Sequence, residues 1–102
     1  MIRAQDPITH PCVLHKNHGS AVPLLTEAHH ILPLGAGGPD TLENKVDVCA
    51  TGHYNVHRLM GLMVFLQPLP TRHNRKEMAM ALKGVRLWNE AGKPGSPASF
   101  WG

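Results

Sequence analysis

The chain has 102 residues, which is enough for one domain with a modest core and too few for two independently folded units. Ten Lys and Arg residues against seven Asp and Glu residues give a net charge of +3 with neutral histidines, which suits an anionic partner without requiring one. The N-terminus lacks the apolar stretch of a signal peptide, and the longest apolar stretch, Leu59 to Leu66, falls far short of the roughly 20 residues that span a bilayer. We therefore expect a cytoplasmic protein with no membrane partner.

An extended arm and a β-hairpin are expected in the first half of the chain. Residues 1–11 lack periodicity and contain two prolines, whereas residues 12–33 are rich in Val, Leu and Ile without a helical stripe, which favours short strands. Glycines and a proline within residues 34–40 predict a tight surface loop. Residues 44–49 alternate polar and apolar side chains, so we expect them to pair with the strand before the loop.

Two helices and a tail are expected after the hairpin. Thr51 can cap a first helix, whose apolar residues recur every three or four positions until the prolines at 68 and 70 end it. Thr71 can cap a second helix that ends at Gly92. The residues expected to form its buried stripe are Met78, Ala81, Leu82, Val85 and Trp88. Residues 93–102 are rich in Gly, Pro and Ser, so we expect a disordered tail apart from Phe100 and Trp101.

Histidines are frequent and clustered. Six of the eight lie in the stretch that also contains both cysteines, which is a pattern that indicates a metal site. His53 and His57 are four residues apart, so a helix places both rings on one face. This pair alone is equally compatible with metal binding and with a plain polar face. The metal interpretation gains from the hairpin in front, because packing of the helix on it can bring His29, His30 and Asn44 to the same place.

A longer series of residues carries a family resemblance. In chain order its segments are His29-His30-Ile31, Gly37-Gly38, Asn44, Cys49 and His53-Tyr54-Asn55-Val56-His57. This series resembles the HNH endonuclease family, and the match covers about residues 12–58. The probability that such a match arises by chance is on the order of a per cent. The resemblance implies an α+β fold with a ββα-metal (His-Me finger) core over 12–66, a helical extension over 71–92, and one HNH nuclease domain over 1–102.

The resemblance also implies a role for each site residue. His29, His53 and His57 would hold one divalent cation, and an all-nitrogen ligand set accommodates Mg, Mn, Ni or Zn. His30 would act as general base and take a proton from the attacking water. Asn44 would brace the loop that orients His30, since an amide does not change its protonation near neutral pH. The alternative is that these residues are surface strand and turn residues.

Glu27 lies two residues before His29, a spacing that places both side chains on one face of a strand. Two interpretations stay open for it. A solvent-exposed carboxylate is the more common outcome, and a hydrogen-bond partner of a metal ligand is the other.

Many proteins of this family add a structural zinc held by paired Cys-x2-Cys segments. The corresponding segments here are Cys12-Val13-Leu14-His15 and Cys49-Ala50-Thr51-Gly52, so the second has lost a ligand. Cys12, His15 and Cys49 are three candidate ligands, and His18 could supply a fourth. Buried thiols and a Cys12–Cys49 disulfide are the alternatives.

Double-stranded DNA is the expected partner. Arg58 and the basic residues of 72–76 could contact phosphates, although a solvated helix face is as common for such a charged run. Similarity to short phage and bacterial HNH proteins suggests a phage terminase as a further partner and the host cytoplasm as the location. The alternative function is a catalytically silent, zinc-stabilised module that binds DNA or a partner protein. His30 argues for the enzyme, because binding alone has no use for a base at this position.

Overall fold

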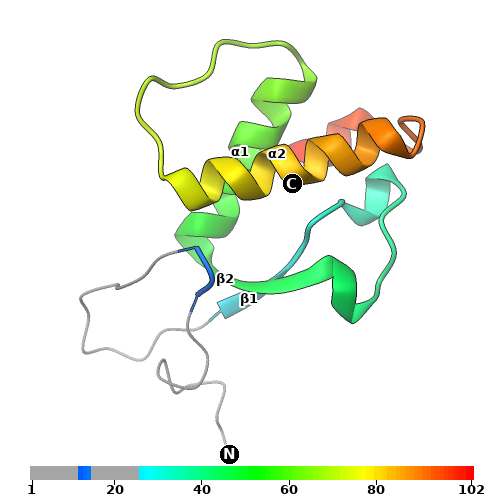
Figure 1. The fold of residues 1–102 in the computed structure, drawn as a ribbon, viewed down its shortest axis with the longest axis horizontal. Helices are drawn as coiled ribbons and strands as arrows, with labels where there is room; N and C mark the ends of the chain where they lie inside the picture. The colour runs from blue at the N-terminus through cyan, green and yellow to red at the C-terminus, as the bar shows by residue number, and fades with distance from the viewer. Residues whose placement is uncertain (1–11, 15–25) are drawn as a thin grey trace, which may run out of the picture.

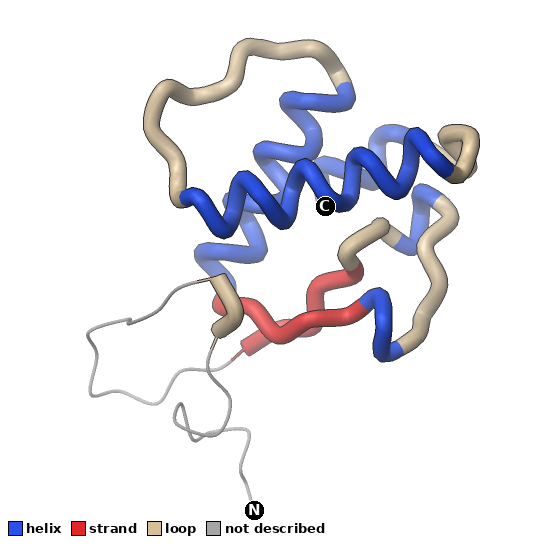
Figure 2. Tube along the Cα trace, in the orientation of Figure 1, coloured by secondary structure: helices blue, strands red, loops and turns tan. Residues whose placement is uncertain are grey.

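The computed structural model describes residues 12–14 and 26–102, so the arm expected over 1–11 lies outside the described part. The elements in chain order are β1 (Thr26–His30), η2 (Leu34–Ala36), η3 (Leu42–Asn44), β2 (Lys45–Cys49), α1 (Ala50–Val64), α2 (Arg75–Glu90) and η4 (Pro97–Trp101), where η denotes a 3-10 helix. An antiparallel pair of strands and two α-helices confirm the expected α+β class (Figures 1 and 2). Within the described segments, no helix is both long enough and apolar enough to cross a bilayer.

The two strands form a hairpin with a long connection. His29 pairs with Val46 and His30 pairs with Lys45, so both histidines lie at the end of β1 next to the connecting loop. The strand alternates its side chains, and His29 is the residue of β1 that is fully buried. In the loop, Gly37 ends η2 with a φ of 89°, a left-handed conformation that favours glycine.

Helix α1 follows β2 with no intervening loop. Cys49 is its N-cap, and the Cys49 Sγ accepts the N–H of Gly52 at 3.3 Å. The helix therefore begins at Ala50, before the cap that we expected at Thr51. The apolar side chains that it buries in the core are Val56, Leu59 and Met60.

Helix α2 packs against α1 and crosses it in Figure 1, but it begins later than expected. Asn74 is the N-cap, since its Oδ1 accepts the N–H groups of Lys76 and Glu77 at 2.8 and 3.1 Å. The helical extension expected over 71–92 is therefore the shorter Arg75–Glu90, and Thr71 lies in the preceding loop.

The buried stripe of α2 agrees with the expected one at Ala81 and Trp88, and Met78 and Val85 are partly buried against the core. Its buried residues are Glu77, Ala81, Gly84 and Trp88. Leu82, which we expected in the core, is 43 % exposed. Gly84 lies on the buried face, and a Cβ atom there would overlap the backbone carbonyl oxygen of Ile31, so α2 comes close to the chain after β1 at this position.

The expectation of a disordered tail over 93–102 is wrong. Residues 97–101 form η4, which packs against α1 and η2. Phe100 is completely buried and its ring meets that of Trp88 edge to face, with centroids 5.0 Å apart. Hydrogen bonds also hold the backbone of the tail. The Trp88 indole donates to the Pro94 carbonyl oxygen at 2.9 Å, and the Ser96 N–H donates to the Gly35 carbonyl oxygen at 2.8 Å. Burial of a large aromatic side chain is sufficient to order a short segment rich in Gly and Pro.

Candidate metal centre and catalytic pocket

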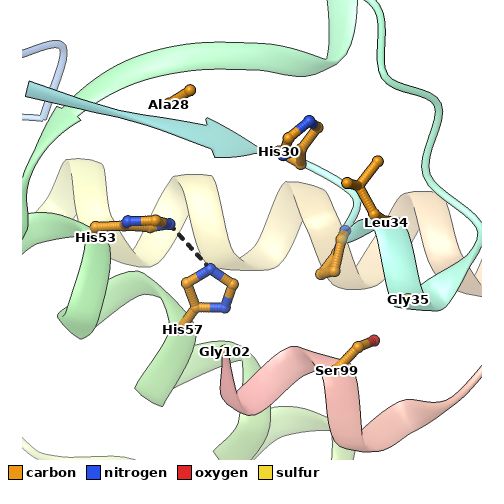
Figure 3. A pocket seen from close by; sticks show the side chains of 9 residues that line it. Ala28, His30, Leu34, Gly35, His53, His57, Ser99 and Gly102 are labelled. Carbon is orange, nitrogen blue, oxygen red and sulfur yellow. Dashed lines mark hydrogen bonds between the residues drawn. The ribbon is translucent and has the colours of Figure 1, made fainter.

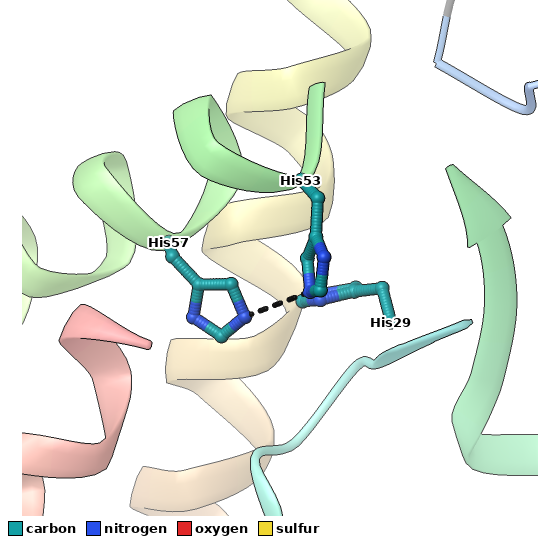
Figure 4. Close-up of side chains that lie close together, drawn as sticks. All are labelled: His29, His53 and His57. Carbon is teal, nitrogen blue, oxygen red and sulfur yellow. Dashed lines mark hydrogen bonds between the residues drawn. The ribbon is translucent and has the colours of Figure 1, made fainter. Parts of the chain in front are cut away.

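Three histidines from two elements converge where α1 meets the hairpin. His29 comes from β1, and His53 and His57 come from successive turns of α1 (Figure 4). One nitrogen from each ring can be chosen so that the three atoms lie within 4.8 Å of one another. In residues 12–14 and 26–102, this is the one group of three or more His, Cys, Asp or Glu side chains placed closely enough to bind a metal ion.

The Nδ1 atoms of the two helical histidines, His53 and His57, form hydrogen bonds with groups outside the cluster. Nδ1 of His53 lies 2.8 Å from Oε1 of Glu27, and Nδ1 of His57 lies 3.1 Å from the carbonyl oxygen of Phe100. Because these oxygens accept hydrogen bonds, each neutral ring carries its hydrogen on Nδ1 and a lone pair on Nε2. Glu27, whose role the sequence left open, is therefore a partner of a candidate ligand.

The two Nε2 atoms of His53 and His57 face each other at 3.1 Å (Figures 3 and 4). Two lone pairs at this distance repel unless a proton or a cation lies between them. A tetrahedral zinc ion with Zn–N distances of 2.0–2.1 Å holds neighbouring nitrogens about 3.3 Å apart. The observed separation is thus close to the one that a shared metal ion requires.

His29 is the most buried histidine of the group. Its side chain is 0 % exposed, and neither ring nitrogen has a hydrogen-bond partner among the described residues. Burial, together with the nearby His57, His53 and His30, lowers the pKa of His29 to about 3. The ring is therefore neutral at pH 7, and a buried polar group left without a partner costs about 1–3 kcal/mol.

These observations fit a divalent cation held by three neutral imidazoles. Burial also lowers the pKa of His57, as does the neighbouring His53, although the carbonyl of Phe100 acts in the opposite direction. A ligand histidine commonly donates its second N–H to a carboxylate or a backbone carbonyl, as His53 and His57 do. The unpartnered nitrogens of His29 supply the third donor.

His30 lies beside this group and is held by other contacts. It lines a pocket of about 300 Å³ together with His53 and His57 (Figure 3). Its Nε2 lies 3.0 Å from Oδ1 of Asp40, which also binds Nζ of Lys45 at 3.0 Å. The hydrogen bonds from His30 and Lys45 hold the pKa of Asp40 below its ordinary value, so the carboxylate is charged and accepts the His30 N–H. This leaves Nδ1 of His30 as the nitrogen that can accept a proton.

Asn44 bonds to the backbone of the hairpin loop. Its Oδ1 accepts the N–H of Leu32, and its Nδ2 donates to the carbonyl oxygens of Leu32 and Pro39, each at 2.9 Å. The side chain is 6 % exposed, and these three hydrogen bonds all go to backbone groups. It ties the loop that contains Asp40 to the residues that follow β1.

Cys12 and Cys49 are buried next to each other. The N–H of Cys49 donates to Sγ of Cys12 at 3.1 Å, and the N–H of Leu14 donates to the same sulfur at 3.4 Å. Burial raises the pKa of the Cys49 thiol, and no disulfide joins the two cysteines. His15 and His18 lie outside the described residues, so the structural zinc stays a prediction.

The sequence analysis missed two residues that contact this site, Asp40 and Phe100. Asp40 belongs to a Gly-Gly-Pro-Asp segment that we interpreted only as a turn, although an Asp close to a candidate base was a usable signal. Phe100 contributes a backbone carbonyl, which no sequence pattern reveals. Arg58 and residues 72–76 are exposed, as phosphate contacts would need to be.

Comparisons with protein-family models, curated proteins and solved structures found no match to this chain. Its function is therefore inferred from its own residues.

Proposed function

We propose that the protein is a metal-dependent DNA endonuclease of the HNH type, in which β1, β2 and α1 form a ββα-metal core. The observation that carries this proposal is the division of the four histidines. His29, His53 and His57 each place one ring nitrogen within 4.8 Å of the others, whereas His30 lines a pocket with His53 and His57 and is hydrogen-bonded to Asp40 instead. A metal site with a separate base beside it suits phosphodiester hydrolysis.

The chain's own residues divide the work of hydrolysis. His30 accepts a proton from water at Nδ1 as the water oxygen bonds to phosphorus and the bond to the 3′-oxygen breaks. Asp40 stabilises the resulting imidazolium through the hydrogen bond at Nε2. Asn44 keeps the loop with Asp40 in position. A divalent cation bound by the three other histidines would supply positive charge that stabilises the phosphate during cleavage.

A catalytically silent, zinc-stabilised module is the competing function. It requires no base, and the hydrogen bond between His30 and Asp40 would then be an ordinary surface contact. The two functions therefore differ in whether His30 is needed for turnover.

Nicking of supercoiled plasmid DNA tests the proposal. We expect nicking with one or more of Mg²⁺, Mn²⁺, Ni²⁺ and Zn²⁺, and none with EDTA. His30→Ala should lower the rate by a factor of roughly 10² to 10⁴, the usual contribution of a general base. Leu82→Ala is the control, because Leu82 is exposed, lines neither pocket and lies outside the basic residues of 72–76. Absence of nicking with every metal would refute an enzymatic function, and a His30→Ala rate equal to that of Leu82→Ala would refute His30 as the base.

A further inference from the structure

A second pocket lies beside two of the three candidate ligands, His53 and His57. It has a volume of about 320 Å³ and shares His53, His57 and Gly102 with the pocket that contains His30. Its remaining walls are Glu27, Ala50, Tyr54 and Trp101. Tyr54 is 68 % exposed and Trp101 is 46 % exposed, so two aromatic rings are available to a ligand beside the candidate metal centre.

The ring of Trp101 is held in place before any ligand binds. It lies against Gly61 of α1, where a Cβ atom would overlap the indole, and it stacks on Phe65 with centroids 5.7 Å apart and an interplanar angle of 10°. The preceding residue, Phe100, is buried and binds His57 through its carbonyl. The indole is thus fixed relative to the site, so little conformational entropy is lost when a ligand contacts it.

The chemistry of the pocket favours a planar, uncharged ring. Aromatic side chains stack with planar rings, and the carboxylate of Glu27, which lines the same pocket, repels a phosphate. In a nucleic acid, the groups that flank a phosphodiester and have these properties are the bases. We propose that Tyr54 and Trp101 bind an unpaired nucleobase next to the phosphate that is cleaved.

This inference rests on the proposed function and restricts its substrate. A base inside a duplex has both faces covered by its neighbours, so it must leave the stack to contact Trp101. Single strands, and duplexes that contain a mismatch or a gap, should therefore bind more tightly than fully paired DNA of the same length.

Binding to charge-matched strands tests the proposal. The probes are a fluorescein-labelled oligothymidine and a strand of equal length in which abasic sugars replace the nucleosides, measured by anisotropy with Zn²⁺ in the His30→Ala background. We expect oligothymidine to bind roughly 5- to 150-fold more tightly, the range for stacking one base on an aromatic side chain. Trp101→Leu and Tyr54→Leu should each reduce this preference, whereas Trp101→Phe and Tyr54→Phe retain a ring and should keep most of it. Leu82→Ala on α2 is the control, since Leu82 is exposed and lines neither pocket.

Equal binding of the two strands, or a preference that survives both leucine variants, would overturn the inference. In the same assay, tighter binding of a fully paired duplex than of a mismatched duplex of equal length would also overturn it. These results are separate from failure of the proposed function, which is read from metal-dependent nicking by the wild type. Tyr54 stands outside the Trp101 packing, so its variants keep the test valid if Trp101→Leu does not fold.

Discussion

At the scale of single residues, His29 shows most clearly what the site requires. A completely buried imidazole with no partner for either nitrogen is unfavourable in the metal-free protein. Two other candidate ligands lie close by, so a bound cation would relieve this cost. The free energy of unfolding should therefore depend on both pH and bound metal through His29.

The low pKa of His29 predicts that the metal-free protein loses stability as the pH falls from 6.5 toward 3. The folded state has a pKa of about 3 and the ordinary value is 6.5, so in this window the unfolded state binds one more proton at this site. The free energy of unfolding should fall by as much as about 1.4 kcal/mol per pH unit from this group. Urea unfolding in EDTA across this range measures it. His29→Gln should remove much of the slope while the exposed control His73→Ala keeps it, and equal slopes in the two variants would contradict the assignment.

At the scale of elements, the C-terminal 3-10 helix is part of the site. η4 packs on α1, its Phe100 fills the core next to Trp88, and the Phe100 carbonyl binds Nδ1 of His57. Glu27 of β1 binds His53 in the corresponding way. Each helical histidine is therefore oriented by an element other than its own helix.

Phe100→Ala should destabilise the protein and also weaken metal binding. Removal of a buried phenyl ring typically costs about 3–5 kcal/mol, and the cavity loosens the segment whose carbonyl orients His57. Urea unfolding gives the first effect and titration with Zn²⁺ gives the second. Pro97→Ala in the same 3-10 helix is the control, because Pro97 is exposed. An unfolding midpoint equal to that of Pro97→Ala would show that η4 does not support the core.

At the scale of the whole molecule, local patterns and long-range packing explain different parts of the structure. Strand alternation predicted the hairpin, and the recurrence of apolar residues every three or four positions predicted α1. The choice of His29 as the third candidate ligand came from the family resemblance. The start of α2 was misplaced because Thr71 and Asn74 are both good caps, and the helix uses Asn74. The order of the tail depends on contacts of Phe100 with residues distant in sequence, which composition cannot reveal.

The central claim is that His29, His53 and His57 bind one cation, whereas His30 does not bind it and acts as the general base. Metal content per chain, measured with cleavage rate on the same preparations of wild type, His30→Ala, His57→Ala and Leu82→Ala, tests this most directly. We expect His30→Ala and Leu82→Ala to bind as much divalent metal as the wild type, His57→Ala to bind less, and only wild type and Leu82→Ala to cleave at the full rate. Equal loss of metal from His30→Ala and His57→Ala would contradict the division of roles, as would cleavage by His30→Ala at the wild-type rate.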